Sequence, residues 1–312
     1  MDKKIIVSII VPIFDYKEIL LKKFFINLNS LFKKNQSYSK KIKLEVIIIN
    51  NNKKSKINLF FKKNYNNINN FKLLNFTKEG NPGLARNYGV KKSKGDFILF
   101  LDFNDKINET NFIKILNEID KTEDLIILKY FKKNDENNNL HKKINPKKLI
   151  IKNFLKREYD ESSNYYLLKK KFLIKNKIVF ERGFYEDRSF ILKIFFYAKK
   201  IKRTKNLSYI KINKRKSITN RFSKKHLIDF INSSKQKRSF VINKMKNSKY
   251  NFKKDLQYGL RGDFNHILKK IVKYRKIIYR NFVKKSYFKI LDANFIAKTL
   301  IDHKIKKILI NE

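Results

Sequence analysis

The sequence has 312 residues, of which 42% are hydrophobic and 33% are charged, and it contains no cysteine. This length and composition predict one large domain or two smaller ones with a sizeable core, and they exclude a disordered polyelectrolyte. The lack of cysteine excludes a disulfide framework, a cysteine-ligated metal site and thiol catalysis.

The net charge is +49, from 76 basic and 27 acidic residues. Charge of this size is typical of proteins that bind nucleic acid or an anionic membrane surface. Most of the basic residues are lysine, however, whereas arginine is the side chain that recognises phosphate and guanine through paired hydrogen bonds. Lysine, asparagine, isoleucine and phenylalanine are also the residues that AT-rich codons favour. Codon bias and a nucleic-acid partner are therefore both open explanations of the charge.

The first 130 residues alternate between short apolar segments and segments with helical periodicity. The expected strands cover residues 4–14, 44–49, 71–76, 96–101 and 124–130, and the expected helices include residues 17–33, 82–92 and 108–121. This alternation predicts an α/β fold with a mainly parallel sheet and helices on both faces. Polar residues follow three of the strands, at Asp15, 50–52 and 102–105. Because ligands bind at the carboxyl ends of parallel strands, we expect these residues to line one edge of a site.

The pattern becomes looser after residue 130. Residues 132–148 are polar and predict a loop. Short apolar segments follow at 165–168 and 178–180, and we expect a helix to begin near Glu186. From about residue 215 the chain is helical in pattern and strongly basic.

These shifts in pattern predict a domain over residues 1–215 and a basic helical region over residues 216–312. Within the second region, apolar residues recur at helical spacing between Asn265 and Leu291, among many lysines. A basic amphipathic helix of this kind can lie on anionic lipid, and helices that pack on the first domain are the alternative. No apolar run reaches the ~18 residues of a transmembrane helix, so we expect a cytoplasmic protein. If the basic helix lies on anionic lipid, we expect the protein to be peripheral at the inner face of the membrane.

Glycine, proline and alanine are scarce in this sequence, but they cluster in one segment. Four of the seven glycines lie within sixteen residues, together with a proline, an alanine and an arginine: Gly80, Pro82, Gly83, Ala85, Arg86, Gly89 and Gly95. Codon bias works against these residues, and their cluster therefore predicts a segment with a local structural or chemical requirement.

Two clusters of acidic residues could carry chemistry. Asp102, Asn104 and Asp105 follow a buried strand, where oxygen ligands suit a hard divalent cation that also binds phosphates. The alternative is a turn with helix-capping carboxylates. Glu186 and Asp187 stand at an expected helix start, where a carboxylate can act as a general base or simply complement the helix dipole.

Several of these segments together resemble the family-2 inverting glycosyltransferases of the GT-A fold. The resemblance rests on VSIIVPIF at 7–14, EVIII at 45–49, GLARNYGVKKSKGDFILFLDFND at 83–105 and GFYEDRSF at 183–190, with Tyr209 and KSIT at 216–219 after them. The segments occur in the family's order and at its spacing, over residues 5–220. The resemblance implies a nucleotide-sugar-binding GT-A domain of the bacterial surface-polysaccharide type, followed here by the helical region.

The resemblance also implies a role for individual residues. Asp187 would be the base that deprotonates the acceptor hydroxyl, and Glu186 would lie near the acceptor. A divalent cation, Mg²⁺ or Mn²⁺, would be held on the donor diphosphate by Asp102, Asn104 and Asp105. The donor, a UDP-sugar, would be bound by Pro12, Phe14, Asp15, Asn50, Asn51, Arg86 and Asp102.

Two departures from the family pattern affect the donor site. The chain has Asn50-Asn51-Asn52-Lys53 where the family has Asp-Asp-Gly-Ser, and Asn104 replaces a second carboxylate. They allow a changed donor, a weaker metal site or an inactive relative that serves as an assembly partner. We therefore expect a transferase acting on a glycan or lipid-linked acceptor, with no specific nucleic-acid partner; an inactive relative and a nucleic-acid-binding protein are the alternatives.

Overall fold

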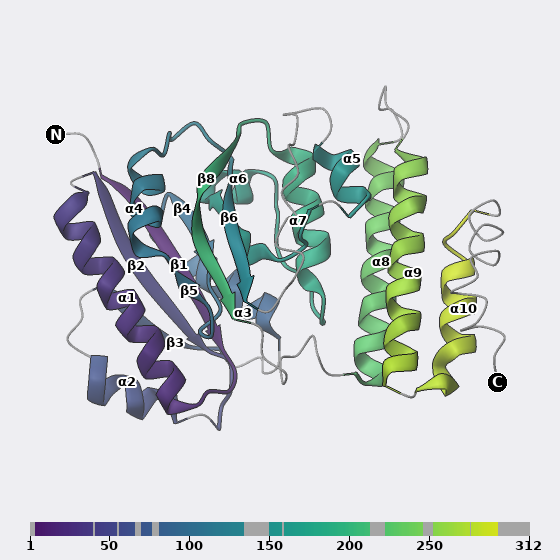
Figure 1. Ribbon diagram of the computed structural model, residues 1–312, viewed down its shortest axis with the longest axis horizontal. Coiled ribbons are helices and arrows are strands. Elements are labelled where there is room, and N and C mark those ends of the chain that lie inside the picture. The colour runs from purple at the N-terminus through teal and green to yellow at the C-terminus, as the bar shows by residue number, and fades with distance from the viewer. Residues whose placement is uncertain are drawn as a thin grey trace. The chain divides into compact units, whose positions relative to one another are not determined.

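The computed structural model of the chain describes residues 4–39, 41–54, 56–65, 70–76, 81–133, 150–157, 159–212, 222–245, 252–274 and 276–292 (Figure 1). Most of the expected 132–148 loop and the KSIT segment at 216–219 lie outside these ranges. The chain divides into two compact units, one formed by Met1–Asn139 and Glu161–Lys214, the other by Leu140–Asp160 and Arg215–Glu312. The sequence pattern predicts one domain over residues 1–215 and a basic helical region over residues 216–312.

The first unit contains an eight-stranded sheet with the order β3-β2-β1-β4-β7-β6-β8-β5. The strands are β1 (Ile5–Ile13), β2 (Ile42–Asn50), β3 (Phe71–Asn75), β4 (Phe97–Phe100), β5 (Lys106–Ile107), β6 (Leu125–Lys133), β7 (Tyr166–Lys169) and β8 (Ile201–Ile212). β1 pairs in parallel with β2 and β4, β2 with β3, and β6 with β8, whereas β7 and β5 pair antiparallel with their neighbours. The expected α/β fold with a mainly parallel sheet is therefore confirmed.

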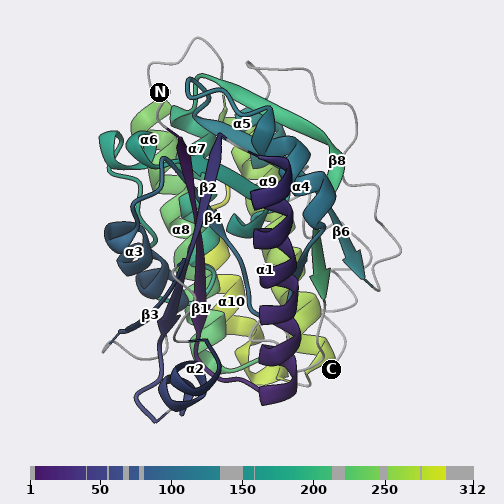
Figure 2. The ribbon, with the colours of Figure 1, turned by 90° about the vertical axis from the view of Figure 1, so that its left-hand side faces the viewer.

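Helices cover this sheet on both faces. They are α1 (Glu18–Tyr38), α2 (Ile57–Tyr65), α3 (Pro82–Lys92), α4 (Glu109–Asn117), α6 (Lys170–Lys175) and α7 (Glu186–Tyr197), with a 3₁₀ turn, η1, at Ser163–Tyr165. Figure 2 shows α1 and α3 on opposite sides of β1 and β2. The apolar side of α1 buries Leu21, Phe25 and Leu28, but Ile19, which the helical pattern placed on that side, lies in the first turn and is 63% exposed.

The parallel strands bring the predicted polar segments to one edge. Ile13 at the end of β1 pairs with Asn50 at the end of β2, and the next backbone N–H, that of Asn51, donates to the Ile13 carbonyl at 2.8 Å. On the other side of β1, the N–H of Leu101 donates to the carbonyl of Ile10 at 3.0 Å. The residues after β1, β2 and β4 are therefore neighbours, as the strand pattern predicted.

The second unit is helical. Its elements are α5 (Ile150–Leu155), α8 (Lys224–Met245), α9 (Lys253–Lys273), a 3₁₀ turn, η3 (Ile277–Tyr279), and α10 (Arg280–Phe288). The helical pattern predicted from Asn265 to Leu291 is therefore interrupted: the N–H of Lys276 donates to the Ile271 carbonyl at 2.9 Å and closes α9. The helices of this unit enclose an ion pair between Lys237 and Asp263, 3.2 Å apart and both fully buried. Within the described part of the chain, every helix is too short or too polar to cross a bilayer.

Candidate functional site

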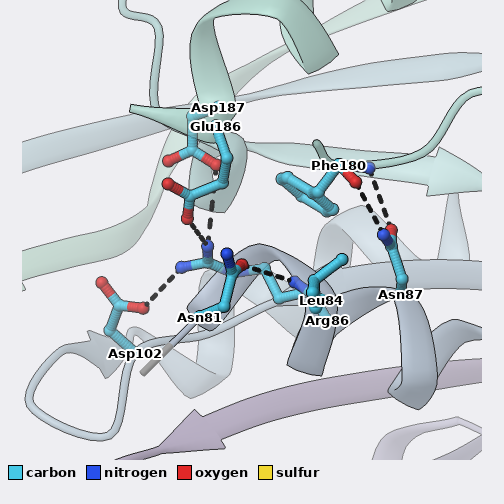
Figure 3. Close-up of polar contacts among 8 residues, drawn as sticks. All are labelled: Asn81, Leu84, Arg86, Asn87, Asp102, Phe180, Glu186 and Asp187. Atoms are coloured by element: carbon cyan, nitrogen blue, oxygen red, sulfur yellow. Dashed lines mark hydrogen bonds and ion pairs between the residues drawn. The ribbon is translucent and has the colours of Figure 1, made fainter. Parts of the chain in front are cut away.

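Arg86 lies at the centre of a charged cluster in the first unit (Figure 3). It extends from α3, and its Nη2 lies 3.2 Å from Oδ1 of Asp102, which follows β4. Its Nη1 lies 2.8 Å from Oε1 of Glu186 and 3.7 Å from Oδ1 of Asp187, both in the first turn of α7. The guanidinium group therefore connects the turn after β4 with the start of α7. These four residues, all expected in the site, lie together.

Two contacts bring α3 close to the chain that precedes α7. The side chain of Asn87 donates to the Phe180 carbonyl at 2.8 Å and accepts from the Phe180 N–H at 2.9 Å. This short apolar segment is not in the sheet, and the backbone of Phe180 pairs with the Asn87 side chain instead. A Cβ atom on Gly83 would lie 2.7 Å from Cγ of Glu186, so only glycine allows this approach.

The start of α7 sets the direction of the two carboxylates. The residue before the helix, Tyr185, has a left-handed backbone with φ 65° and ψ 24°, and its side chain does not cap the helix. Glu186 and Asp187 therefore occupy the first helical positions rather than the capping position. Oδ1 of Asp187 is buried and lies 3.7 Å from Nη1 of Arg86, whereas the side chain as a whole is 24% exposed. A bound molecule would therefore meet this carboxylate on its exposed side.

Burial and mutual repulsion control the charge of this cluster. Burial, followed by the neighbouring Asp187 carboxylate, raises the pKa of Glu186 to about 7 against the opposing effect of Arg86. Burial also raises the pKa of Asp187, and again Arg86 opposes the shift. For Arg86 burial acts to lower the pKa, but the carboxylates of Asp187, Asp102 and Glu186 outweigh it and raise the pKa above the usual value. Arg86 is therefore positively charged, whereas ionisation of Glu186 or of Asp187 makes ionisation of the other less favourable.

Glu186→Gln should flatten the dependence of stability on pH. The pKa of this group is 4.5 in its ordinary state and about 7 in the folded protein, so the folded chain holds an extra proton between these values. The stability from that proton is fully present below the unfolded pKa and is lost as pH rises through the folded pKa. We expect the melting temperature of the wild type, minus that of Glu186→Gln, to fall from pH 4.5 to about 8. A constant difference over this range would contradict the raised pKa.

The turn after β4 presents its two aspartates in different directions. The Asp102 side chain is 38% exposed and touches only Arg86 among the ion pairs of the described residues. Asp105 is buried, and its carboxylate accepts from the Tyr209 hydroxyl at 2.6 Å and from the Ile212 N–H at 2.8 Å. Burial, followed by the charge of Asp102, raises the pKa of Asp105 to about 6. Asp105 thus fastens the turn to β8, while Asp102 faces the Arg86 cluster.

The side chains of this turn could hold a cation that a substrate also binds, but they would not hold a metal ion by themselves. Among the described residues, no three acidic or histidine side chains are grouped so that they could hold a metal ion. Mg²⁺ needs only one or two carboxylates when substrate phosphates and water supply its other ligands. Asp102 is such a carboxylate, and the half-buried Asn104 carries an amide oxygen in the same turn. The residues therefore fit a diphosphate-bound cation, with Asp105 already engaged by β8.

The asparagines after β2 form a neutral polar group. Nδ2 of Asn50 donates to Oδ1 of Asn75 at 2.9 Å, and Oδ1 of Asn50 accepts from the N–H of Asn52 at 3.2 Å. Asn51 is 2% exposed, and its Oδ1 accepts no hydrogen bond from the described residues. Because Asn50 and Asn51 are neutral, the segment after β2 carries no charge, whereas two aspartates there would be negatively charged.

The remaining expected donor residues belong to β1 and the residues after it. Pro12 is half-buried within β1, and Phe14 and Asp15 are exposed beyond its end, with Phe14 46% exposed. The roles of Gly83 and Asn87 were missed, although both lie in the quoted GLARNYGV segment. The clustering of glycines was the available signal for Gly83; Asn87 gave none, because its partner lies more than 90 residues away.

Comparison with known proteins gives one family and several structures. The model of glycosyl transferase family 2 matches residues 8–186, which is more than half of the chain. A search of curated protein sequences found no match.

Solved structures share the fold at low sequence identity. S. aureus TarS 1-349 is 19% identical with a TM-score of 0.65, and the match covers 97% of this chain and 87% of that chain. The same protein in complex with UDP-GlcNAc is 18% identical with a TM-score of 0.56, covering 92% and 93%. The mannosyltransferase PcManGT from Pyrobaculum calidifontis, in complex with GDP-Man and Mn²⁺, is 11% identical with a TM-score of 0.54, covering 99% and 86%. At these identities the likeness shows the fold.

Proposed function

This chain belongs to glycosyl transferase family 2, and we propose that it moves a sugar from a nucleoside-diphosphate donor to a hydroxyl of a glycan or lipid-linked acceptor, with inversion at the anomeric carbon. The observation that carries the proposal is the cluster in which Arg86 joins Asp102 to Glu186 and Asp187. A diphosphate beside Asp102 and an acceptor beside Asp187 would stand on opposite sides of one guanidinium group. Similar structures were solved with UDP-GlcNAc and with GDP-Man, which supports a nucleotide-sugar donor.

In the proposed reaction Asp187 is the general base. Its carboxylate, which is 24% exposed, accepts the proton of the acceptor hydroxyl while the hydroxyl oxygen bonds to the anomeric carbon. The bond from that carbon to the diphosphate oxygen breaks on the opposite face, so the nucleoside diphosphate leaves and the configuration inverts. One base is enough because no covalent intermediate forms, in contrast to a retaining glycosidase.

Arg86 and Glu186 support this base. Arg86 stabilises the ionised form of Asp187, which burial disfavours, and so keeps a proton acceptor available near neutral pH. Glu186, with a pKa of about 7, lies beside Asp187 and would hydrogen-bond an acceptor hydroxyl. A divalent cation, when bound by Asp102 and Asn104, would neutralise charge on the leaving diphosphate.

Calorimetry of UDP binding tests the donor proposal. The wild type should bind UDP more tightly with Mn²⁺ than with EDTA, and Asp102→Asn should reduce that difference because it removes the carboxylate offered to the cation. Asp120→Asn, which changes an exposed carboxylate outside the cluster, is the matched control. Equal affinity for UDP in Mn²⁺ and EDTA would remove the cation from the proposal, and failure to bind either UDP or GDP would remove the donor.

The alternative is a catalytically inactive member of the family, because asparagines replace the expected carboxylates after β2 and at position 104. A protein that binds UDP but releases none from UDP-GlcNAc or another UDP-sugar, in the presence of broken-cell membranes as acceptor, would fit that alternative. Release of UDP with transfer to the membrane fraction would support the enzyme.

We also propose that the second unit binds the surface of an anionic membrane. Ile278 is 84% exposed and Phe282 is 47% exposed, and basic residues surround them in sequence: Lys276, Arg280, Lys284 and Lys285. Apolar side chains among basic ones suit a bilayer interface with anionic lipid. The double variant Ile278→Asp with Phe282→Asp should sediment less with vesicles of phosphatidylserine and phosphatidylcholine. Ile26→Asp, at another exposed isoleucine, should sediment like the wild type; equal sedimentation of all three proteins would refute the surface.

A further inference from the structure

Lys211 lies near the end of β8 and on the same side of that strand as Tyr209, because side chains two residues apart in a strand share a face. Both contact Tyr165 of η1: the rings of Tyr165 and Tyr209 lie edge to face at 5.3 Å, and Nζ of Lys211 lies 5.7 Å from the Tyr165 ring centre. The Tyr209 hydroxyl reaches Asp105, as described above. The Lys211 side chain therefore lies beside the turn that carries Asp102.

The charge of Lys211 is uncommitted, in contrast to that of Arg86. Arg86 has a carboxylate within 4 Å on three sides, those of Asp102, Glu186 and Asp187. Lys211 has no carboxylate within that distance among the described residues. Its ammonium nevertheless acts on Asp105 and on Asp187, since it opposes the burial that raises the pKa of each carboxyl group.

A bound donor would change the charge balance of this site. Arg86 is the cation beside the carboxyl groups of Asp102, Glu186 and Asp187, and the carboxyl group of Asp105 lies in the same turn as Asp102. A nucleoside diphosphate adds further negative charge at the turn after β4, and a phosphate in a partly buried site needs cationic or hydrogen-bonding partners. A lysine on a flexible stem can act as such a partner as a point charge.

We propose that Lys211 is a further donor-binding residue, whose ammonium group contacts the diphosphate of the bound nucleotide. This inference rests on the proposed function. It adds a cation from β8 to the site residues from α3, α7 and the turn after β4. The contacts of Asp105 with Tyr209 and Ile212 hold this turn against the end of β8 from which Lys211 extends.

The test compares UDP with uridine as probes, in EDTA, so that the protein's own cations are measured. Lys211→Met should weaken UDP binding on the order of 10- to 100-fold, the loss of one charge-assisted hydrogen bond, and should leave uridine binding unchanged. Lys211→Arg should recover most of the UDP affinity. Lys205→Met, at an exposed lysine of the same strand, is the matched control and should bind both probes like the wild type.

The outcomes separate this inference from the proposed function. If the wild type binds UDP and Lys211→Met binds it equally well, Lys211 is a solvated lysine over a tyrosine ring and the inference fails while the proposed function stands. If Lys211→Met loses uridine and UDP affinity in parallel, or melts well below the wild type, the residue is structural and the inference again fails. If the wild type binds neither UDP nor GDP, the role of Lys211 and the proposed function are both refuted.

Discussion

Asp187→Asn should lose sugar transfer by ~10²–10⁴-fold while it binds UDP as the wild type does. The substitution preserves the size of the side chain and removes the group that accepts the acceptor's proton. UDP affinity should be kept because Asp102, and not Asp187, lies in the turn after β4. Turnover and calorimetric affinity, measured on the same preparation, check both parts of the expectation.

A purely structural role for Asp187 makes the opposite forecast. A carboxylate in the first turn of α7 complements the helix dipole, and its loss would cost about 0.3–1 kcal/mol of stability but leave turnover almost unchanged. Glu181→Gln is a suitable control, because it removes a neighbouring carboxylate whose only ion pair in the described residues is with Lys193, at 2.7 Å. It should retain turnover. Near-normal turnover of Asp187→Asn would sink the assignment, and lost UDP affinity would place Asp187 on the donor side.

Arg86→Met should destabilise the fold by about 3–5 kcal/mol at neutral pH, the usual result of breaking a buried ion pair from one side. The variant leaves Glu186, whose side chain is 7% exposed, and Asp187 without their cation. Chemical denaturation at pH 7.5 measures the loss. At pH 5.5 the loss should be smaller, since Glu186, with a pKa of about 7, is then mostly protonated and needs no counter-charge.

Arg182→Met provides the comparison, because Arg182 is an exposed arginine a few residues before α7. It should change the free energy of unfolding by less than ~0.5 kcal/mol, as is usual for surface positions. An Arg86→Met variant as stable as Arg182→Met would show that the three carboxylates do not depend on the guanidinium group. A loss that is equal at the two pH values would show that the charge of Glu186 does not change between them.

The strands that form the site edge could be predicted because their signal is local. β1 and β2 are buried along almost their whole length, and buried parallel strands show as continuous runs of Ile, Val and Leu. The position of the site at one edge of the sheet could be predicted from the same pattern, since polar residues come directly after each strand. The convergence of Arg86, Asp102, Glu186 and Asp187 was expected from the family resemblance rather than from spacing.

The orientation of single side chains could not be predicted because it depends on distant partners. Asp102 and Asp105 are three residues apart, yet one faces Arg86 and the other is taken by Tyr209 and Ile212 of β8. Nothing in the turn itself distinguishes them; the pairing of β5 with β8 does. The role of Arg86 as a bridge was missed for the same reason, since Glu186 is 100 residues further along the chain.

The left-handed backbone of Tyr185 has a consequence for laboratory evolution of this protein. A side chain in that conformation costs ~1–2 kcal/mol relative to glycine, and this cost falls immediately before Glu186 and Asp187. Selection for heat resistance alone would therefore favour glycine or asparagine at this position. Selection for turnover would preserve whatever direction the tyrosine imposes on α7. The residues recovered at position 185 under the two selections would thus show whether stability is lost in order to orient Glu186 and Asp187.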